Sequence, residues 1–189
     1  MKKITLYLSI VIVLLSCSPY KKITNTTLPD PFKFTLVDSI PQTKNQLYVK
    51  ANSWMAKTLN SAKEVIQMQD KEAGKLIGKA VIQVNGPING FGQPLGYDYV
   101  YYTISIDVKD GKYRCVLSDF YHEGGTHTEG KAVKQSTSYG SLDNKSVPSE
   151  IMFSMPNRWD GIKSTAMTRS QNLLEDFKKK MKDKNTDDF

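Results

Sequence analysis

The sequence predicts an α+β fold in which a strand and a helix precede a group of antiparallel strands, and a second helix ends the domain. Two observations carry this prediction: apolar residues recur at helical spacing in two segments, and a long alternating segment is interrupted by Asp110-Gly111. Alternation is typical of strands, and a spacing of three to four residues is typical of helices. Residues 32–182 comprise about 150 residues, enough for one hydrophobic core, so we predict a single domain there.

The first strand is predicted at residues 32–37 and is ended by Pro41. Thr43-Lys44-Asn45-Gln46 fits a capping box, with Thr43 as the N-cap and Gln46 reaching back to it. The apolar stripe that follows comprises Leu47, Tyr48, Ala51, Trp54, Met55 and Leu59. We therefore expect a helix that buries this stripe.

Two more strands are predicted at residues 64–69 and 76–84, with a turn at 70–74 in which Gly74 is free to adopt a positive φ. Gly78 and Ala80 lie on one face of the second of these strands. Small residues there predict a helix packed close to that face.

The clearest predicted element is a hairpin that begins at residue 97. Asp110-Gly111 predicts a two-residue type I′ turn, which pairs residue 109 with 112 and fixes the register outward from there. One face then holds Ile106 opposite Cys115, and we interpret this face as core. On the other face, Asp107 is opposite Arg114, and these side chains can form an ion pair across the strands.

The same register predicts a candidate binding face at the far end of the hairpin. It places Tyr101 opposite Phe120 and Tyr99 opposite His122 on the face away from the core. Exposed aromatic residues at this density can mark a binding surface. The alternative is that the segment after His122 covers this face, through Trp159.

The remainder of the domain is predicted to be a loop followed by a helix. Residues 122–146 are rich in Gly, Ser and Thr and predict a loop with an edge strand at 132–135, and residues 147–155 are expected to be extended. The stripe of the last helix comprises Ile162, Ala166, Ser170, Leu173, Phe177 and Met181. Lys178, Lys179 and Lys180 lie near its C-terminus, where positive charge suits the helix dipole.

Residues 1–16 have the three parts of a secretory signal: a positive start, an apolar run too short to span a bilayer, and a small residue at the cleavage site. Leu14-Leu15-Ser16-Cys17 resembles the lipobox of bacterial lipoproteins, although Leu15 is bulkier than is usual there. The resemblance implies that Cys17 receives a diacylglyceryl group and becomes the acylated first residue of the mature chain. Two or three acyl chains would then hold the protein stably on the lipid bilayer.

The residues after Cys17 indicate where the lipoprotein resides. Residue 18 is a serine and not the aspartate that would resemble an inner-membrane retention signal, so we expect the outer membrane. No acidic run follows Cys17, so we expect the domain to face the periplasm. Exposure on the cell surface is the alternative. Residues 17–31 are polar and predict a lipidated tether, and residues 183–189 predict a disordered tail.

Composition limits the partners. The formal charge of +7 falls to +5 once Lys2 and Lys3 leave with the signal, and export excludes intracellular nucleic acid as a partner. Cys115 is the only other cysteine, so the mature chain can form no intramolecular disulfide. We expect Cys115 to be buried as a small apolar residue.

Residues 61–79, from Ser61 through Val65-Ile66-Gln67-Met68-Gln69 to Lys79, resemble the signature of a family of exported Gram-negative proteins. This family is a domain of unknown function with a TATA-binding-protein-like fold. The resemblance runs from Phe34 to Tyr121. It implies a curved antiparallel sheet with two helices packed on one face, in the order β-α-β-β-β-β-α, and implies no activity, cofactor or catalytic residue.

Two further motifs carry residues typical of binding sites. His122, Glu123, His127 and Glu129 combine imidazoles and carboxylates that suit zinc, but the histidines are five residues apart and Gly124-Gly125 disfavours the helix of a zinc protease. A solvated loop is the favoured interpretation. Four glycines lie between residues 86 and 96 but open a strand rather than a helix, which disfavours a phosphate-binding loop.

The leading hypothesis is a non-enzymatic, lipid-anchored domain of the cell envelope without a cofactor. It would bind an envelope protein or glycan through the open sheet face, since the sequence shows no serine or cysteine nucleophile with a placed base. The alternative is a metal-binding or hydrolytic envelope protein that uses residues 122–129.

Overall fold

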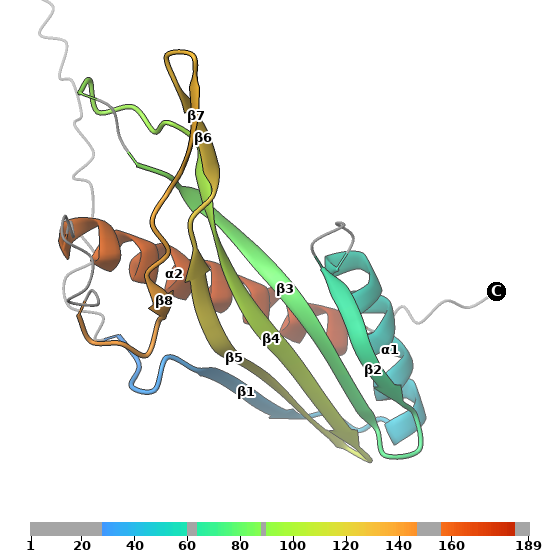
Figure 1. The fold of residues 1–189 in the computed structure, drawn as a ribbon. Helices are drawn as coiled ribbons and strands as arrows, with labels where there is room; N and C mark the ends of the chain where they lie inside the picture. Colours follow the sequence, from blue (N-terminus) through green and yellow to red (C-terminus); the bar gives the residue numbers. More distant parts are fainter. Residues whose placement is uncertain (1–27, 60–63, 88–89, 147–155, 184–189) are drawn as a thin grey trace, which may run out of the picture.

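The computed structural model describes residues 28–59, 64–87, 90–146 and 156–183 (Figure 1). The predicted signal, Cys17 and most of the tether, the segment 147–155 and most of the tail lie outside these residues. The elements follow in the order β1 (Phe34–Ser39), α1 (Lys44–Thr58), β2 (Val65–Asp70), β3 (Lys75–Asn85), β4 (Tyr97–Lys109), β5 (Lys112–Glu123), β6 (Thr126–Glu129), β7 (Ala132–Gln135), β8 (Gly140–Ser141) and α2 (Pro156–Lys182).

The main sheet is antiparallel, with the strand order β1-β5-β4-β3-β2, and β8 adds a short pairing to β5. Figure 1 shows both helices behind this sheet, with the near face uncovered. The predicted α+β class, with a sheet and two helices on one face, is therefore confirmed. No helix among the described residues is long and apolar enough to cross a membrane.

The first helix forms as its sequence predicts. Thr43 is the N-cap, and the reciprocal hydrogen bonds with Gln46 complete the capping box. All six residues of the predicted stripe are buried. A Cβ on Gly78 would lie 2.4 Å from Leu59 Cδ1, so the end of α1 lies close to β3 and a larger residue there would displace the leucine side chain.

The β4–β5 hairpin has the predicted pairing but not the predicted turn. Lys109 pairs with Lys112, yet only Gly111 of the two turn residues has a positive φ, at 71°. A type I′ turn requires a positive φ at both, so that prediction is wrong. Tertiary contacts hold the turn instead: the Asp110 carboxylate accepts the Lys44 N–H at 2.6 Å, and the Gly111 carbonyl accepts the Ile40 N–H at 2.9 Å.

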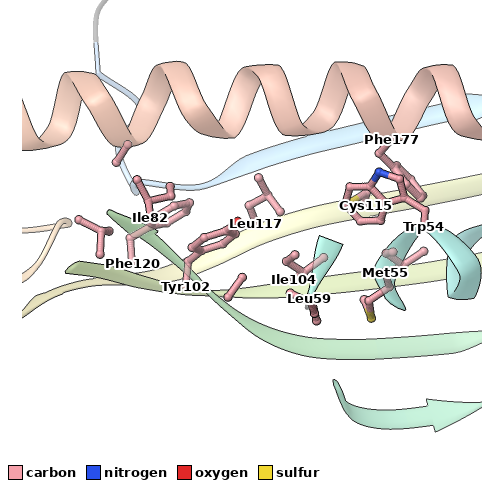
Figure 2. Packing of buried hydrophobic residues seen from close by; sticks show 14 of the residues in the cluster. Trp54, Met55, Leu59, Ile82, Tyr102, Ile104, Cys115, Leu117, Phe120 and Phe177 are labelled. Carbon is pink, nitrogen blue, oxygen red and sulfur yellow. The ribbon is translucent and has the colours of Figure 1, made fainter. Parts of the chain in front are cut away.

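The core lies between the sheet and the helices, as Figure 2 shows along part of α2. Trp54 of α1 and Phe177 of α2 contact each other with ring centroids 4.7 Å apart. Cys115 is fully buried beneath them, as predicted. Every residue of the predicted α2 stripe is buried or packs against this core.

Buried Lys50 was not predicted. Its ammonium group donates hydrogen bonds to the backbone carbonyls of Met181, at 3.3 Å, and Asp183. Met181 lies in the last turn of α2 and Asp183 directly follows the helix, where no intrahelical donor is available for the carbonyls. Lys50 of α1 therefore caps the C-terminus of α2, and burial lowers the pKa of its ammonium group.

The segment after β5 is more ordered than the predicted loop. The predicted edge strand at 132–135 exists as β7, but it pairs with β6, and both extend as a separate two-stranded hairpin beyond the end of the main sheet (Figure 1). Gly130 takes a positive φ of 64° at its turn. The chain then returns through β8 to the edge of β5.

Candidate functional site

A β-bulge at Asp119 decides which side chains of β5 face the helices. Thr103 of β4 pairs with Ser118 of β5. Tyr101, two residues earlier on β4, pairs with Tyr121, three residues later on β5, so β5 contains one extra residue. Asp119 has a φ of 56°, a left-handed conformation that aspartate tolerates better than most residues. Because side chains alternate along a strand, the extra residue reverses the facing of every later side chain of β5.

The predicted register is therefore wrong beyond residue 118, and Phe120 and His122 do not lie on the open face. Phe120 is 2% exposed and stacks on Tyr102, with ring centroids 5.1 Å apart. His122 is fully buried and stacks on Tyr139 at 5.0 Å. Trp159, the alternative cover for the open face, is buried on the helix side and meets His122 edge-on at 6.4 Å.

The open face at this end of the sheet carries four tyrosines, which we call the tyrosine patch: Tyr97, Tyr99 and Tyr101 of β4, and Tyr121 of β5. The structure places Tyr99 and Tyr101 on this face, as predicted, with ring centroids 6.4 Å apart. Tyr97 is 53% and Tyr121 49% exposed. Neither was predicted as a site residue, and Tyr121 could not be placed without the bulge.

Polar side chains border the tyrosine patch. On β3, Gln83 pairs with Tyr99 and Asn85 pairs with Tyr97, and both amide side chains are exposed. On β5, exposed Glu123 pairs with Tyr99. Two amides and one carboxylate thus border the aromatic rings.

The opposite end of the open face is charged. Asp107 lies between two cations there, with its carboxylate 2.8 Å from the Arg114 guanidinium and 3.8 Å from the Lys75 ammonium. The ion pair of Asp107 with Arg114 confirms the predicted cross-strand contact. Lys109 and Lys112 add further positive charge beside it.

A second candidate site is a buried polar cluster around Asp98. The side chain of Asp98 faces the core, like those of the other buried residues that alternate along β4. Its Oδ2 lies 3.2 Å from His122 Nε2 and pairs with the Arg158 guanidinium of α2. Its Oδ1 accepts the Gly125 N–H at 3.0 Å. Burial raises the pKa of the Asp98 carboxyl, but the hydrogen bonds from His122 and Gly125 and the charge of Arg158 outweigh burial and hold the pKa below its ordinary value.

The geometry of this cluster does not suit acid–base catalysis. Nδ1 of His122 accepts the Tyr139 N–H at 3.1 Å, so the ring hydrogen lies on Nε2 and is donated to Asp98. Both ring nitrogens are engaged within the protein, and neither is positioned to receive a proton from a nucleophile. Arg158 also donates to the Tyr139 hydroxyl at 3.0 Å. The cluster therefore fastens α2 to the sheet.

Three of the predicted metal candidates, His122, Glu123 and His127, do not form a common site. His122 faces the core, whereas Glu123 faces solvent on the open side of the sheet. His127 lies on β6 with Nδ1 3.4 Å from Ser136 Oγ, and Glu129 ends β6 opposite Ala132. Among the residues that the structure describes, no three His, Cys, Asp or Glu side chains form a group that could hold a metal ion.

Cys115 offers no accessible thiol. Its side chain is fully buried between the sheet and the helices, and burial raises the pKa of the thiol strongly. The placement on the core face agrees with the sequence prediction.

Comparisons with known proteins identify the fold. Residues 34–123 match the family described as a domain of unknown function, DUF4468, with a TBP-like fold. A crystal structure of a DUF4468 family protein from Bacteroides ovatus ATCC 8483 superposes with a TM-score of 0.58 and 14% identity, covering 82% of this chain and 88% of that one. A TBP-like protein from Parabacteroides distasonis ATCC 8503 gives a TM-score of 0.58 and 13% identity, covering 82% and 94%. At these identities the likeness concerns the fold alone, and no curated protein matches the chain.

Proposed function

We propose that the protein is a non-enzymatic binding module of the cell envelope. Residues 34–123 match a family with a TBP-like fold that is described without an activity, so the proposal rests on the protein's own surface. The observation that carries this proposal is the tyrosine patch on the sheet face that neither helix covers. A rigid ring that also carries a hydroxyl gives large contact area and a hydrogen bond at low entropic cost, which suits tyrosine to binding surfaces.

The sequence supplies the proposed location. Export by the signal in residues 1–16 and lipidation of Cys17 would anchor the module to the outer membrane, with the periplasm as its compartment. Mass spectrometry of the mature N-terminus tests this step. We expect an acylated Cys17 as the first residue, and a mature chain that retains Met1 would contradict the proposal.

Binding is tested by capture from solubilised envelope fractions with three forms of the protein. The wild type and a control, Thr168→Ala with Asn172→Ala on the exposed side of α2, should retain the same envelope component. Tyr101→Ala with Tyr121→Ala should lose it while keeping the wild-type circular dichroism spectrum. Equal capture by all three forms would refute the open face as the binding surface.

A further inference from the structure

The chemistry around the tyrosine patch indicates what kind of ligand it accepts. Charges of both signs border the patch: Glu123 beside Tyr99, exposed Asp119 at the bulge two residues from Tyr121, and Lys79 two residues along β3 from Val81. Lys79 is already engaged, since its ammonium group donates to Thr103 Oγ1 at 2.7 Å. A surface that holds a polyanion interleaves its aromatic rings with lysine and arginine. The patch lacks that interleaving, so it favours an uncharged ligand.

The size of the patch disfavours a protein partner. A tyrosine buries 150–250 Å² when fully covered. Tyr97 and Tyr121 are about half exposed, whereas Tyr99 and Tyr101 are less exposed. The four rings together thus offer on the order of 300 Å² of free surface. A stable protein interface needs about 800 Å² from each partner. To reach that area, a protein would have to extend over the charged end of the sheet.

We infer that the tyrosine patch is a binding site for a neutral oligosaccharide, an inference that rests on the proposed binding function of the open face. A sugar ring has an apolar face of C–H groups, which can stack on a tyrosine, and a rim of uncharged hydroxyls, which need hydrogen-bond partners. Tyr97, Tyr99 and Tyr101 supply three rings in a row along β4, since alternate side chains of a strand share a face.

The amides of β3 complete the site. Gln83 and Asn85 lie beside Tyr99 and Tyr97 respectively, and each amide presents both donors and an acceptor. A hydroxyl both donates and accepts, so an amide can satisfy it without any charge. The sugar chain would therefore follow β4, with its ring faces on the tyrosines and its hydroxyl rim against β3.

The test is isothermal titration of the full chain with three neutral hexasaccharides of different linkage: maltohexaose, cellohexaose and chitohexaose. We expect a Kd of about 1 mM or tighter for at least one of them. Tyr99→Ala with Tyr101→Ala should weaken binding by tenfold or more, and Tyr99→Phe with Tyr101→Phe should retain most of it. Lys109→Ala with Lys112→Ala, at the charged end of the same face, is the matched control and should bind like the wild type.

Gln83→Ala with Asn85→Ala provides a second variant at exposed positions, which cannot act through the core, and should weaken binding at least threefold. Absence of binding by all three sugars at about 5 mM, or equal binding by the tyrosine variant, would overturn the inference. The envelope capture distinguishes this failure from failure of the proposed function. Suppose that the envelope component is still captured through the open face after periodate oxidation of the fraction, but not after its digestion with proteinase. The ligand would then be a protein, which refutes the oligosaccharide inference and leaves the proposed binding function intact.

Discussion

Replacement of Asp98 tests whether the buried polar cluster fastens α2 to the sheet. Asp98→Ala removes the acceptor of three donors: His122 Nε2–H at 3.2 Å, Gly125 N–H at 3.0 Å and the Arg158 guanidinium. A buried donor left without a partner costs about 1–3 kcal/mol, and breaking a buried ion pair costs about 3–5 kcal/mol. Arg158 retains some contact with water, with its side chain 14% exposed. We therefore expect the free energy of unfolding to fall by about 4 kcal/mol.

The measurement is equilibrium unfolding in urea, followed by the fluorescence of buried Trp54 and Trp159. The matched control is Asp107→Ala, which removes a carboxylate of the open face that pairs with half-exposed Arg114. Surface ion pairs contribute about 0–1 kcal/mol, so this control should lose less than about 1 kcal/mol. If Asp98→Ala lost no more than the control, the cluster would not be what holds α2 in place.

The same carboxylate predicts a dependence on pH. Its pKa in the folded protein lies below the ordinary value of 3.8 because the hydrogen bonds and the charge of Arg158 outweigh burial. The unfolded chain therefore binds the proton first as the pH falls, and the stability that Asp98 contributes is complete above pH 3.8 and declines below it. Asp98→Asn, which cannot titrate, should have a flatter stability profile between pH 5 and pH 2 than the wild type, with the range set by carboxyl titration. Parallel profiles would contradict the assigned pKa direction.

Three further predictions follow from the packing. Phe120→Ala should lower the free energy of unfolding by about 3–5 kcal/mol and Tyr121→Ala by less than about 1 kcal/mol, as urea unfolding would show; the reverse order would mean that the bulge at Asp119 is absent. Lys50→Met should leave the last carbonyls of α2 without a donor, so that hydrogen exchange accelerates at its C-terminus while the rest of the helix is unchanged. In a Cys17→Ser form, Cys115 should react with Ellman's reagent only after denaturation, because its thiol is buried; a fast reaction in the native protein would place it on the surface.

Local signals account for the parts of the fold that the sequence predicts well. The capping box at Thr43 and the stripe after it specify α1 without reference to the rest of the chain. The pairing of residue 109 with 112 is likewise local, because a two-residue loop fixes the register next to it. The type of that turn was mispredicted because Asp110 bonds to Lys44, a residue distant in sequence. The hairpin's own residues give no signal of such a long-range hydrogen bond.

The error at the candidate site has one cause, the extra residue at Asp119. The sequence holds a weak signal for it: Ser118 and Asp119 are adjacent polar residues in a strand that otherwise alternates, and aspartate tolerates a positive φ. Asp98 carried a signal too, since it falls in phase with Val100 and the other core-facing residues of β4. A carboxylate in a buried phase requires partners, but which residues these are depends on packing of α2 that the local pattern does not encode.

The bulge also determines together which side chains of β5 face the core and which lie on the open face. If β5 continued in regular alternation through Asp119 instead of bulging, Phe120 and His122 would face solvent, and Tyr121 would face the helices. Asp98 would then lose the imidazole that hydrogen-bonds to it, and Phe120 would replace Tyr121 opposite Tyr101 on the open face. Deletion of residue 119 would remove the bulge and leave regular alternation, with Phe120 still facing the core and Tyr121 still on the open face. Substitutions at the exposed tyrosines can remove the tyrosine patch while sparing the attachment of α2, because their side chains contribute to the open face and not to the core.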